Sequence, residues 1–183
     1  MVNEFVLYMD GQLSNYQVKL VTRENCTEAL DVYTSNQAYF CLCSGCEVGI
    51  ESIYENLEAI PPDLEREKKV TVGIWDREVC IGNLDFLIAY PNPDCLYVGL
   101  LLIHQNYHGK QIGRQVFEAL KKAAERFGLY TILVAVVEEN RGALEFWKKM
   151  GFAQVGMGNV EMREGRQLQV IKMEQKISRY TPP

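Results

Sequence analysis

The residues best suited to chemistry lie in the stretch HQNYHGKQIG, residues 104–113. An apolar run, Leu96 to Ile103, comes before it and is short and β-rich enough to be a buried strand. Apolar residues at helical spacing come after it, in a helix that Gly128 ends. A glycine-bearing loop between a strand and a helix presents backbone N–H groups at the positive end of the helix dipole, where phosphate binds. The sequence therefore predicts a phosphorylated ligand here, and an ordinary strand-to-helix connection is the alternative.

Two common phosphate-binding loops do not fit this stretch. A triphosphate loop needs Gly-Lys-Ser/Thr, and here Gly109-Lys110 is followed by Gln111. A dinucleotide loop needs G-x-G-x-x-G, and the stretch has only Gly109 and Gly113. The spacing therefore argues against both ligand classes.

The segment HGKQIG instead resembles the Q/R-x-x-G-x-G/A phosphate loop of the GNAT superfamily of N-acetyltransferases, with His108 in place of Gln or Arg and Gln111 in place of the first glycine. A second segment, ENRGALEFWKKMGF, resembles the other signature of that superfamily. Its matching residues are Asn140, Ala143, Phe146, Trp147, Lys149, Gly151 and Phe152. Two partial matches in the correct order are more specific than either alone, and the resemblance covers about Tyr16 to Ile177.

The resemblance implies that acetyl-CoA is the acetyl donor. Its pyrophosphate would lie on the backbone N–H groups of residues 108–114, and its pantetheine arm would pair with the strand that ends at Ile103. The space for the arm would come from splaying that strand away from the strand Tyr130 to Val137. The cofactor-binding residues that follow from the resemblance are Leu101, Leu102, Ile103, His108, Gly109, Lys110, Gln111, Ile112, Gly113, Arg114, Asn140, Ala143, Phe146 and Trp147.

The leaving group is the point at which the sequence departs from the superfamily. Many members carry Tyr at the position of Trp147, as the acid that protonates the CoA thiolate, and an indole N–H is not a useful acid. A thiol pKa of ~8.5 lies only about 1.5 units, or roughly 2 kcal/mol, above neutrality, so a thiolate can leave unassisted or be protonated through water. Trp147 also has the spacing of a core aromatic with Ala143, Phe146 and Met150.

The acceptor amine needs a base, because an alkylammonium with a pKa of ~10.4 is almost wholly protonated at pH 7. Asp85 is the candidate, since it interrupts an otherwise apolar strand next to the central one. An outward-facing or loop-bonded Asp85 is the alternative. A backbone N–H near Gly99 to Leu101 would polarise the acetyl oxygen.

Charge gives the only indication of the acceptor. Residues 24–65 contain no Lys or Arg, but they contain nine acids: Glu24, Glu28, Asp31, Glu47, Glu51, Glu55, Glu58, Asp63 and Glu65. The resemblance places this region beside the acceptor pocket, where a negative rim would attract a cationic amine. The alternative is a solvated helix face, because Glu51, Glu55 and Glu58 lie opposite an apolar stripe.

Composition indicates one soluble globular domain over residues 1–183, with 48% hydrophobic and 23% charged residues. No apolar run approaches the roughly 18 residues of a membrane span, and the start MVNEFVLYMDGQ lacks the basic cluster of a signal peptide. We therefore expect no membrane partner and a cytoplasmic location. A net charge of −5 without a basic stripe argues against nucleic acid as a partner.

Six cysteines without a secretory signal predict free thiols in a reducing compartment. Cys41, Cys43 and Cys46 are closely spaced, but zinc usually takes four ligands, and the only histidines, His104 and His108, lie in the phosphate loop. We therefore predict no metal site, and small apolar side chains beside a helix turn instead.

The order of expected elements is β-α-α-β-β-β-α-β-α-β-β, which is also the GNAT order. The expected strands are Tyr16–Val21, Lys69–Trp75, Val79–Ala89, Leu96–Ile103, Tyr130–Val137, Phe152–Glu161 and Leu168–Ile177. Asn25 with Glu28 resembles a capping box for a first helix that runs to about Phe40, and the apolar stripe from Ile50 to Leu57 predicts a second. Residues 1–15 are expected to add a hairpin strand, Phe5 to Met9.

These elements predict an α/β fold of mixed α+β character. The resemblance specifies a GNAT fold: a central, mixed, mostly antiparallel twisted sheet of about seven strands, with splayed central strands and four flanking helices. Sheet edges near the C-terminus could pair in a homodimer. The function that follows is acetyl transfer from acetyl-CoA to a primary amine of a small molecule. The alternatives are a protein or peptide N-acetyltransferase and a non-catalytic acyl-CoA-binding module.

Overall fold

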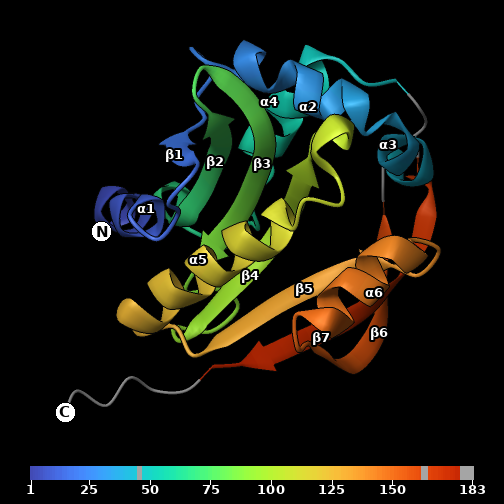
Figure 1. Cartoon of the computed structure of the whole chain (residues 1–183). Coiled ribbons are helices and arrows are strands. Elements are labelled where there is room, and N and C mark those ends of the chain that lie inside the picture. Colours follow the sequence, from blue (N-terminus) through green and yellow to red (C-terminus); the bar gives the residue numbers. More distant parts are fainter. Residues whose placement is uncertain (45–46, 162–164, 178–183) are drawn as a thin grey trace.

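The computed structural model describes residues 1–44, 47–161 and 165–177. Seven strands form one sheet in the order β1-β2-β3-β4-β5-β7-β6, and six α-helices lie on its two sides (Figure 1). Among the described strands only β4 and β5 pair in parallel, so the sheet is mixed and mostly antiparallel, as predicted. The strands are β1 (Gln17–Leu20), β2 (Lys69–Asp76), β3 (Val79–Ile88), β4 (Cys95–Ile103), β5 (Thr131–Val137), β6 (Ala153–Glu161) and β7 (Gln167–Lys176).

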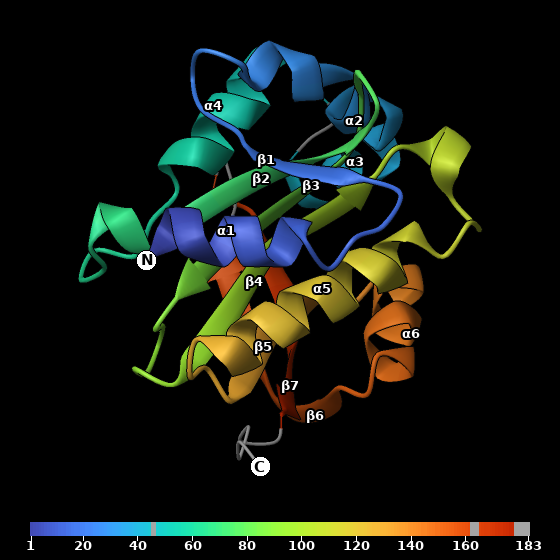
Figure 2. The ribbon, with the colours of Figure 1, turned by 60° about the vertical axis from the view of Figure 1, so that its left-hand side comes forward.

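Helices cover both faces of the sheet. Helices α1 (Val2–Asp10) and α5 (Ile112–Arg126) lie across one face, and α2 (Leu30–Ser35), α3 (Gln37–Ser44) and α4 (Ile50–Glu58) lie at the other (Figure 2). Helix α6 (Arg141–Lys149) packs beside α5, where the Phe117 and Trp147 rings meet edge to face at 5.5 Å. The two larger apolar cores lie one on each side of the sheet.

A bulge at Gly99 divides β4 into two halves that bury opposite faces. In the pairing of β3 with β4, Phe86 faces Val98 and Asp85 faces Leu100, so Gly99 is the extra residue. Val98 therefore joins the core under α1 and α5, whereas Leu100 joins the core under α2 and α4. Glycine is required at the bulge because a Cβ there would lie 2.6 Å from Asp85 Oδ1.

The two central strands separate beyond this bulge. β4 and β5 pair from Cys95 and Thr131 only as far as Val98 and Val134, while β5 continues beside β7 to Val137. The predicted splaying of the central strands is therefore confirmed, and it leaves one edge of β4 open after Gly99.

The N-terminal segment was predicted to be a hairpin strand, and this prediction is wrong. Residues 2–10 form α1, whose buried side chains Phe5, Val6 and Met9 have helical spacing. The Phe5 ring lies 5.4 Å from that of Phe86 in β3 and 5.2 Å from that of Phe127 after α5. A short apolar run fits both the helical and the strand periodicity, and these tertiary contacts favour the helix.

The predicted first helix is broken into a 3-10 turn, η1 (Cys26–Ala29), and helices α2 and α3. Asn25 does not cap it: its side chain accepts from the Thr22 N–H and donates to the Leu20 carbonyl. This break, together with α1, explains why the structure has six α-helices rather than four. The remaining elements lie within a few residues of their predicted ranges.

The cysteines differ in oxidation state. Cys26, Cys43, Cys80 and Cys95 are free and buried, as predicted for a thiol. Cys41 is disulfide-bonded, so the prediction of a free thiol is wrong there, and Cys46 lies outside the described residues. Across the described ranges, no helix is both long and apolar enough to span a membrane.

Candidate active site

A cavity of about 1110 Å³ occupies the gap between the splayed strands. It extends from the loop before α5, along the open half of β4, to the joint between α2 and α3. Every predicted cofactor-binding residue except Lys110 lines it. The lining also includes residues that the sequence did not single out, namely Asn36, Tyr39, Tyr107, Val134, Ala135, Val136, Val137 and Gly142.

The loop end of the cavity presents a row of free backbone donors. The N–H groups of residues 109–114 make no hydrogen bond within the described parts of the chain, and the first bond of α5 runs from Gln115 N–H to Gln111. Gln111 has a left-handed φ of 60°, and its side chain does not cap the helix. No acid occupies the first turn of α5, so the helix dipole is not neutralised there. This arrangement suits a pyrophosphate.

Two cations at the loop end have no counter-ion among the described residues. Arg114 and Lys149 are exposed and line the cavity, and neither makes an ion pair or hydrogen bond with a described residue. Lys110 differs, because its Nζ lies 4.6 Å from the centre of the Tyr107 ring and the residue is absent from the cavity lining. The positive charge at the cavity is therefore supplied by Arg114 and Lys149 rather than by Lys110, which was also predicted to bind the cofactor.

His108 stabilises the loop rather than pointing a free side chain at the ligand. Its Nε2 lies 2.7 Å from the Ile103 carbonyl oxygen, which closes the segment between β4 and α5. The 3-10 turn η3 (Gln105–Tyr107) lies within this segment, and His104 Nδ1 caps it by accepting from the Asn106 N–H. The residue that departs from Gln or Arg at this position is thus engaged with the backbone of its own loop.

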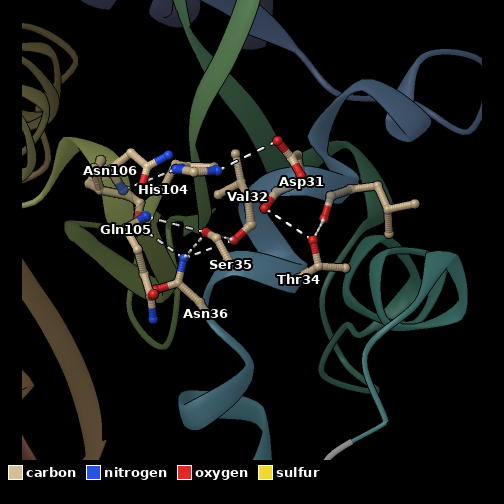
Figure 3. Close-up of polar contacts among 10 residues, drawn as sticks. Asp31, Val32, Thr34, Ser35, Asn36, His104, Gln105 and Asn106 are labelled. Atoms are coloured by element: carbon tan, nitrogen blue, oxygen red, sulfur yellow. Dashed lines mark hydrogen bonds and ion pairs between the residues drawn. The ribbon is translucent and has the colours of Figure 1, made fainter.

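The end of α2 holds the same loop from the other side (Figure 3). Asn36 Nδ2 donates to the Ile103 carbonyl at 3.0 Å, and Ser35 Oγ accepts from the Gln105 N–H at 3.3 Å. His104 Nε2 lies 3.5 Å from the Asp31 carboxylate. Nothing in the local sequence indicated this contact, because Asn36 and Ile103 are 67 residues apart.

The second signature forms the wall of the cavity at α6. Asn140 caps α6 by accepting from the Ala143 N–H at 3.1 Å. Phe146 lies beside the loop, with a ring atom 3.4 Å from where a Cβ on Gly113 would be. Trp147 is 5% exposed and meets the Phe152 ring at 4.9 Å, so it is a core aromatic as well as a lining residue.

Asp85 is buried and ion-paired. Its Oδ2 lies 2.7 Å from Lys69 Nζ and accepts from the Thr71 hydroxyl at 2.8 Å, while Oδ1 lies against Gly99. Burial raises the pKa of Asp85, and the Lys69 charge and the Thr71 hydrogen bond oppose this rise only in part. Asp85 does not face solvent, and it is not in the cavity lining although it lies directly behind a residue that is.

None of the nine acids between Arg23 and Arg66 lines the cavity. Glu51, Glu55 and Glu58 are exposed on α4, and Glu58 pairs with Arg23. The solvated-face interpretation therefore describes these α4 glutamates better than the negative rim does. The charged residues in the lining are basic.

Comparisons with known proteins agree with this geometry. The model of the Acetyltransferase (GNAT) family matches residues 44–152, which is more than half of the chain. A comparison with curated proteins found no match.

Solved structures share the fold. An acetyltransferase from Thermus thermophilus has a TM-score of 0.69 at 21% identity, with 89% of this chain and 97% of that chain covered. The ribosomal-protein-S18-alanine N-acetyltransferase from Escherichia coli has a TM-score of 0.65 at 14% identity, with 91% and 96% covered. A structure of yncA from Salmonella typhimurium with its cofactor acetyl-CoA has a TM-score of 0.63 at 15% identity, with 93% and 98% covered.

The family match covers the loop before α5, the splayed strands and α6, which are the elements that form the cavity. The free N–H groups and unpaired cations at one end of that cavity fit the pyrophosphate of acetyl-CoA, the acetyl donor of the family. The chain therefore belongs to the GNAT family, as an acetyl-CoA-dependent N-acetyltransferase.

Proposed function

We propose that this protein acetylates the primary amine of a small molecule by direct transfer within a ternary complex. The observation that carries the proposal is a cavity with two chemically different ends. One end has free N–H groups and cations, and the other has the Tyr39 side chain beside apolar residues of β5. Donor and acceptor can therefore enter from opposite ends and meet where β4 and β5 separate.

The chemistry divides between the cofactor and the chain. Acetyl-CoA supplies an activated acetyl thioester. The N–H groups of residues 109–114, with Arg114 and Lys149, hold its pyrophosphate, and the open edge of β4 from Leu101 to Ile103 pairs with its arm. A backbone N–H between Gly99 and Leu101 polarises the acetyl oxygen.

The base is proposed to be Asp85, acting through water at Gly99. Its position behind Gly99 supports this role, and its ion pair with Lys69 counts against it. A protein amine is the second candidate acceptor, because the structural neighbour from Escherichia coli acts on a ribosomal protein. The few side chains at the acceptor end favour the small molecule.

Thermal unfolding with and without acetyl-CoA tests donor binding. At a ligand concentration of 100 times Kd, binding stabilises the folded state by about 2.7 kcal/mol. For a chain of this size we expect Tm to rise by about 5–10 °C. No rise at saturating acetyl-CoA would contradict the proposal.

Gly113→Asp places a carboxylate in the first turn of α5, where it repels phosphate but suits the helix dipole. We expect the folded variant to lose the rise in Tm. Gly49→Asp is the matched control, because Gly49 caps α4 outside the cavity lining and no atom lies within 4 Å of the position that an added Cβ would take.

Release of free CoA with a panel of small amines and peptides then identifies the acceptor. Turnover with peptides alone would favour the second candidate, and no turnover with any amine would favour a binding module.

A further inference from the structure

A second cavity, of about 610 Å³, lies beside the first strands of the sheet. Its lining comes from separate segments of the chain: the start of α1, the end of β1, α4, the 3-10 turn η2 (Arg66–Lys68) and the start of β2. We call it the β2 cavity, after Lys69 and Thr71 of β2 in its lining. Among the described residues, none lines both this cavity and the one between the splayed strands. The β2 cavity is therefore separate from the candidate active site.

The charged side chains that line the β2 cavity are mainly basic. They are Arg23, Arg66 and Lys69, with one acid, Glu67. Arg23 and Arg66 are the basic residues on either side of residues 24–65, which contain nine acids and no Lys or Arg. The fold thus gathers positive charge at one cavity of a protein whose net charge is −5.

Arg66 is free to bind a ligand. It is exposed, and it makes no ion pair or hydrogen bond with a described residue. Arg23 differs, because it pairs with Glu58 and its guanidinium lies 4.7 Å from the centre of the Tyr54 ring. A guanidinium presents its N–H donors in a planar fork that suits the oxygens of a carboxylate or a phosphate. Arg66 can therefore bind an oxyanion without breaking a contact within the described chain.

Lys69 is a buried cation with unused hydrogen-bond donors. Its side chain is 7% exposed, and its Nζ lies 2.7 Å from Asp85 Oδ2. Asp85 is its one ion-pair or hydrogen-bond partner among the described residues. An ammonium carries three N–H groups, and buried donors normally have acceptors. Because Lys69 also lines the β2 cavity, a further acceptor can reach it from there.

Asp85 lies between the two cavities. Its Oδ2 is 2.7 Å from Lys69 Nζ and accepts from the Thr71 hydroxyl at 2.8 Å, and both of these residues line the β2 cavity. Its Oδ1 is 2.6 Å from the position that a Cβ on Gly99 would take, and Gly99 lines the other cavity. A change in the charge around Lys69 is therefore felt by the carboxylate behind Gly99.

We propose that the β2 cavity binds a small oxyanion, a phosphate or a carboxylate group, between Arg66 and Lys69. The oxyanion competes with Asp85 for the Lys69 ammonium, because two anions then share one cation. Binding weakens the hold of Lys69 on Asp85, and by reciprocity the loss of Asp85 strengthens oxyanion binding. An anion outside the candidate active site thereby acts on the carboxylate behind Gly99. This inference goes beyond the proposed function.

Thermal unfolding with inorganic phosphate tests the site. The background is Gly113→Asp, because phosphate also suits the loop before α5. Ionic strength is held constant, since salt screens exposed charges. We expect Tm to rise by about 3–6 °C at ten times Kd. Phosphate also stabilises folded proteins through its exclusion from their surface, so the rise needs a matched pair of variants.

Arg66→Gln and Arg126→Gln form that pair. Arg126 is exposed in the last turn of α5 and is outside the lining of both cavities. We expect Arg66→Gln to weaken phosphate binding by about 10-fold or more, because it removes hydrogen bonds to a charged group. Arg126→Gln should leave the affinity unchanged, and each variant is compared with its own Tm without phosphate. Equal rises in the two variants would overturn the inference, because exclusion alone would then explain them.

Succinate in place of phosphate distinguishes a carboxylate ligand from a phosphate ligand. A rise in Tm with either anion that Arg66→Gln reduces would support the inference. No rise with either anion would mean that water alone fills the β2 cavity, and it would overturn the inference.

Asp85→Asn tests the competition for Lys69. It frees the ammonium, so we expect phosphate to bind about 5-fold more tightly or better, although the variant is less stable. Addition of Lys69→Met removes both charges and should weaken phosphate binding below that of the background protein. Unchanged affinity in Asp85→Asn would overturn the competition. If that single variant does not fold, unchanged affinity in the double variant would overturn the role of Lys69. None of these measurements requires acetyl transfer, so their failure is distinct from failure of the proposed function.

Discussion

At the scale of single residues, Asp85 combines two demands that are hard to satisfy together. A base should exchange protons with the substrate, yet this carboxylate is almost fully buried and is paired with Lys69, whose side chain is also largely buried. Breaking such a pair by removing one partner typically costs about 3–5 kcal/mol, because the other charge stays buried without a counter-ion. We therefore expect Asp85→Asn to lower the free energy of unfolding by about that amount, measured by urea denaturation.

The double variant Asp85→Asn with Lys69→Met removes both charges and tests the base separately. We expect it to recover most of the lost stability, because no buried charge is left unpaired. If it folds and still lacks turnover, Asp85 serves the chemistry. If kcat returns together with stability, Asp85 has only a structural role at the Gly99 bulge.

At the scale of elements, the loop before α5 is held by two neighbours and strained at one residue. His108 and Asn36 both bind the Ile103 carbonyl. The free backbone N–H groups of residues 109–114 are therefore held in place by the loop itself and by the end of α2. Gln111 nevertheless keeps a left-handed φ of 60° that only glycine adopts without cost. The fold thus retains a conformation that the side chain disfavours.

Gln111→Gly should relieve this strain. A left-handed conformation costs a non-glycine residue about 1–2 kcal/mol, and the greater freedom of glycine in the unfolded chain offsets about 0.4–1 kcal/mol. We expect a net stabilisation of about 0.5–1 kcal/mol in urea unfolding, with no loss of acetyl-CoA binding, because the backbone N–H stays in place. Gly109→Ala is the converse control: its φ is 76° and its surroundings are open, so strain alone should destabilise it. A lower free energy of unfolding in Gln111→Gly would contradict this prediction. It would show that the Gln111 side chain stabilises the fold by more than its left-handed backbone conformation destabilises it.

At the scale of the whole molecule, buried acids determine how the fold responds to alkali. Burial raises the pKa of Cys80 from 9.0 to about 11, and it also raises the pKa of Tyr33, Tyr39 and Tyr97. These groups keep their protons in the folded state to a higher pH than in the unfolded chain. The unfolded state therefore binds fewer protons above pH 9, and stability falls as the pH rises.

Urea unfolding at several pH values from about 8 to 11 measures this effect. For Cys80 alone, a shift of about two pKa units corresponds to roughly 2–3 kcal/mol, lost between pH 9 and 11. Cys80→Ala should reduce the loss. The reference for each protein is its own stability at about pH 8, where these groups are mostly protonated in both the folded and the unfolded state. A free energy of unfolding that does not fall up to pH 11 would contradict the predicted shifts.

The sequence by itself determined the parts of the protein that are encoded locally. The glycine loop with its helix, the Asn140 cap of α6 and most strands are contiguous patterns, so their periodicity and turn residues specify them. The order of these elements also sufficed for the fold class, because short connections allow few arrangements.

The tertiary structure decided what depends on contacts distant in the chain. The N-terminal run became a helix because Phe5 packs on Phe86 and Phe127. Tyr39 lines the cavity because the chain breaks between α2 and α3 and the central strands separate after Val98 and Val134. Periodicity specifies which face of an element is apolar, but it carries no information on which distant element covers that face or where a bulge reverses it. The glycine loop that lines the cavity could therefore be predicted from the sequence, and the lining residues of α2 and α3 required the fold.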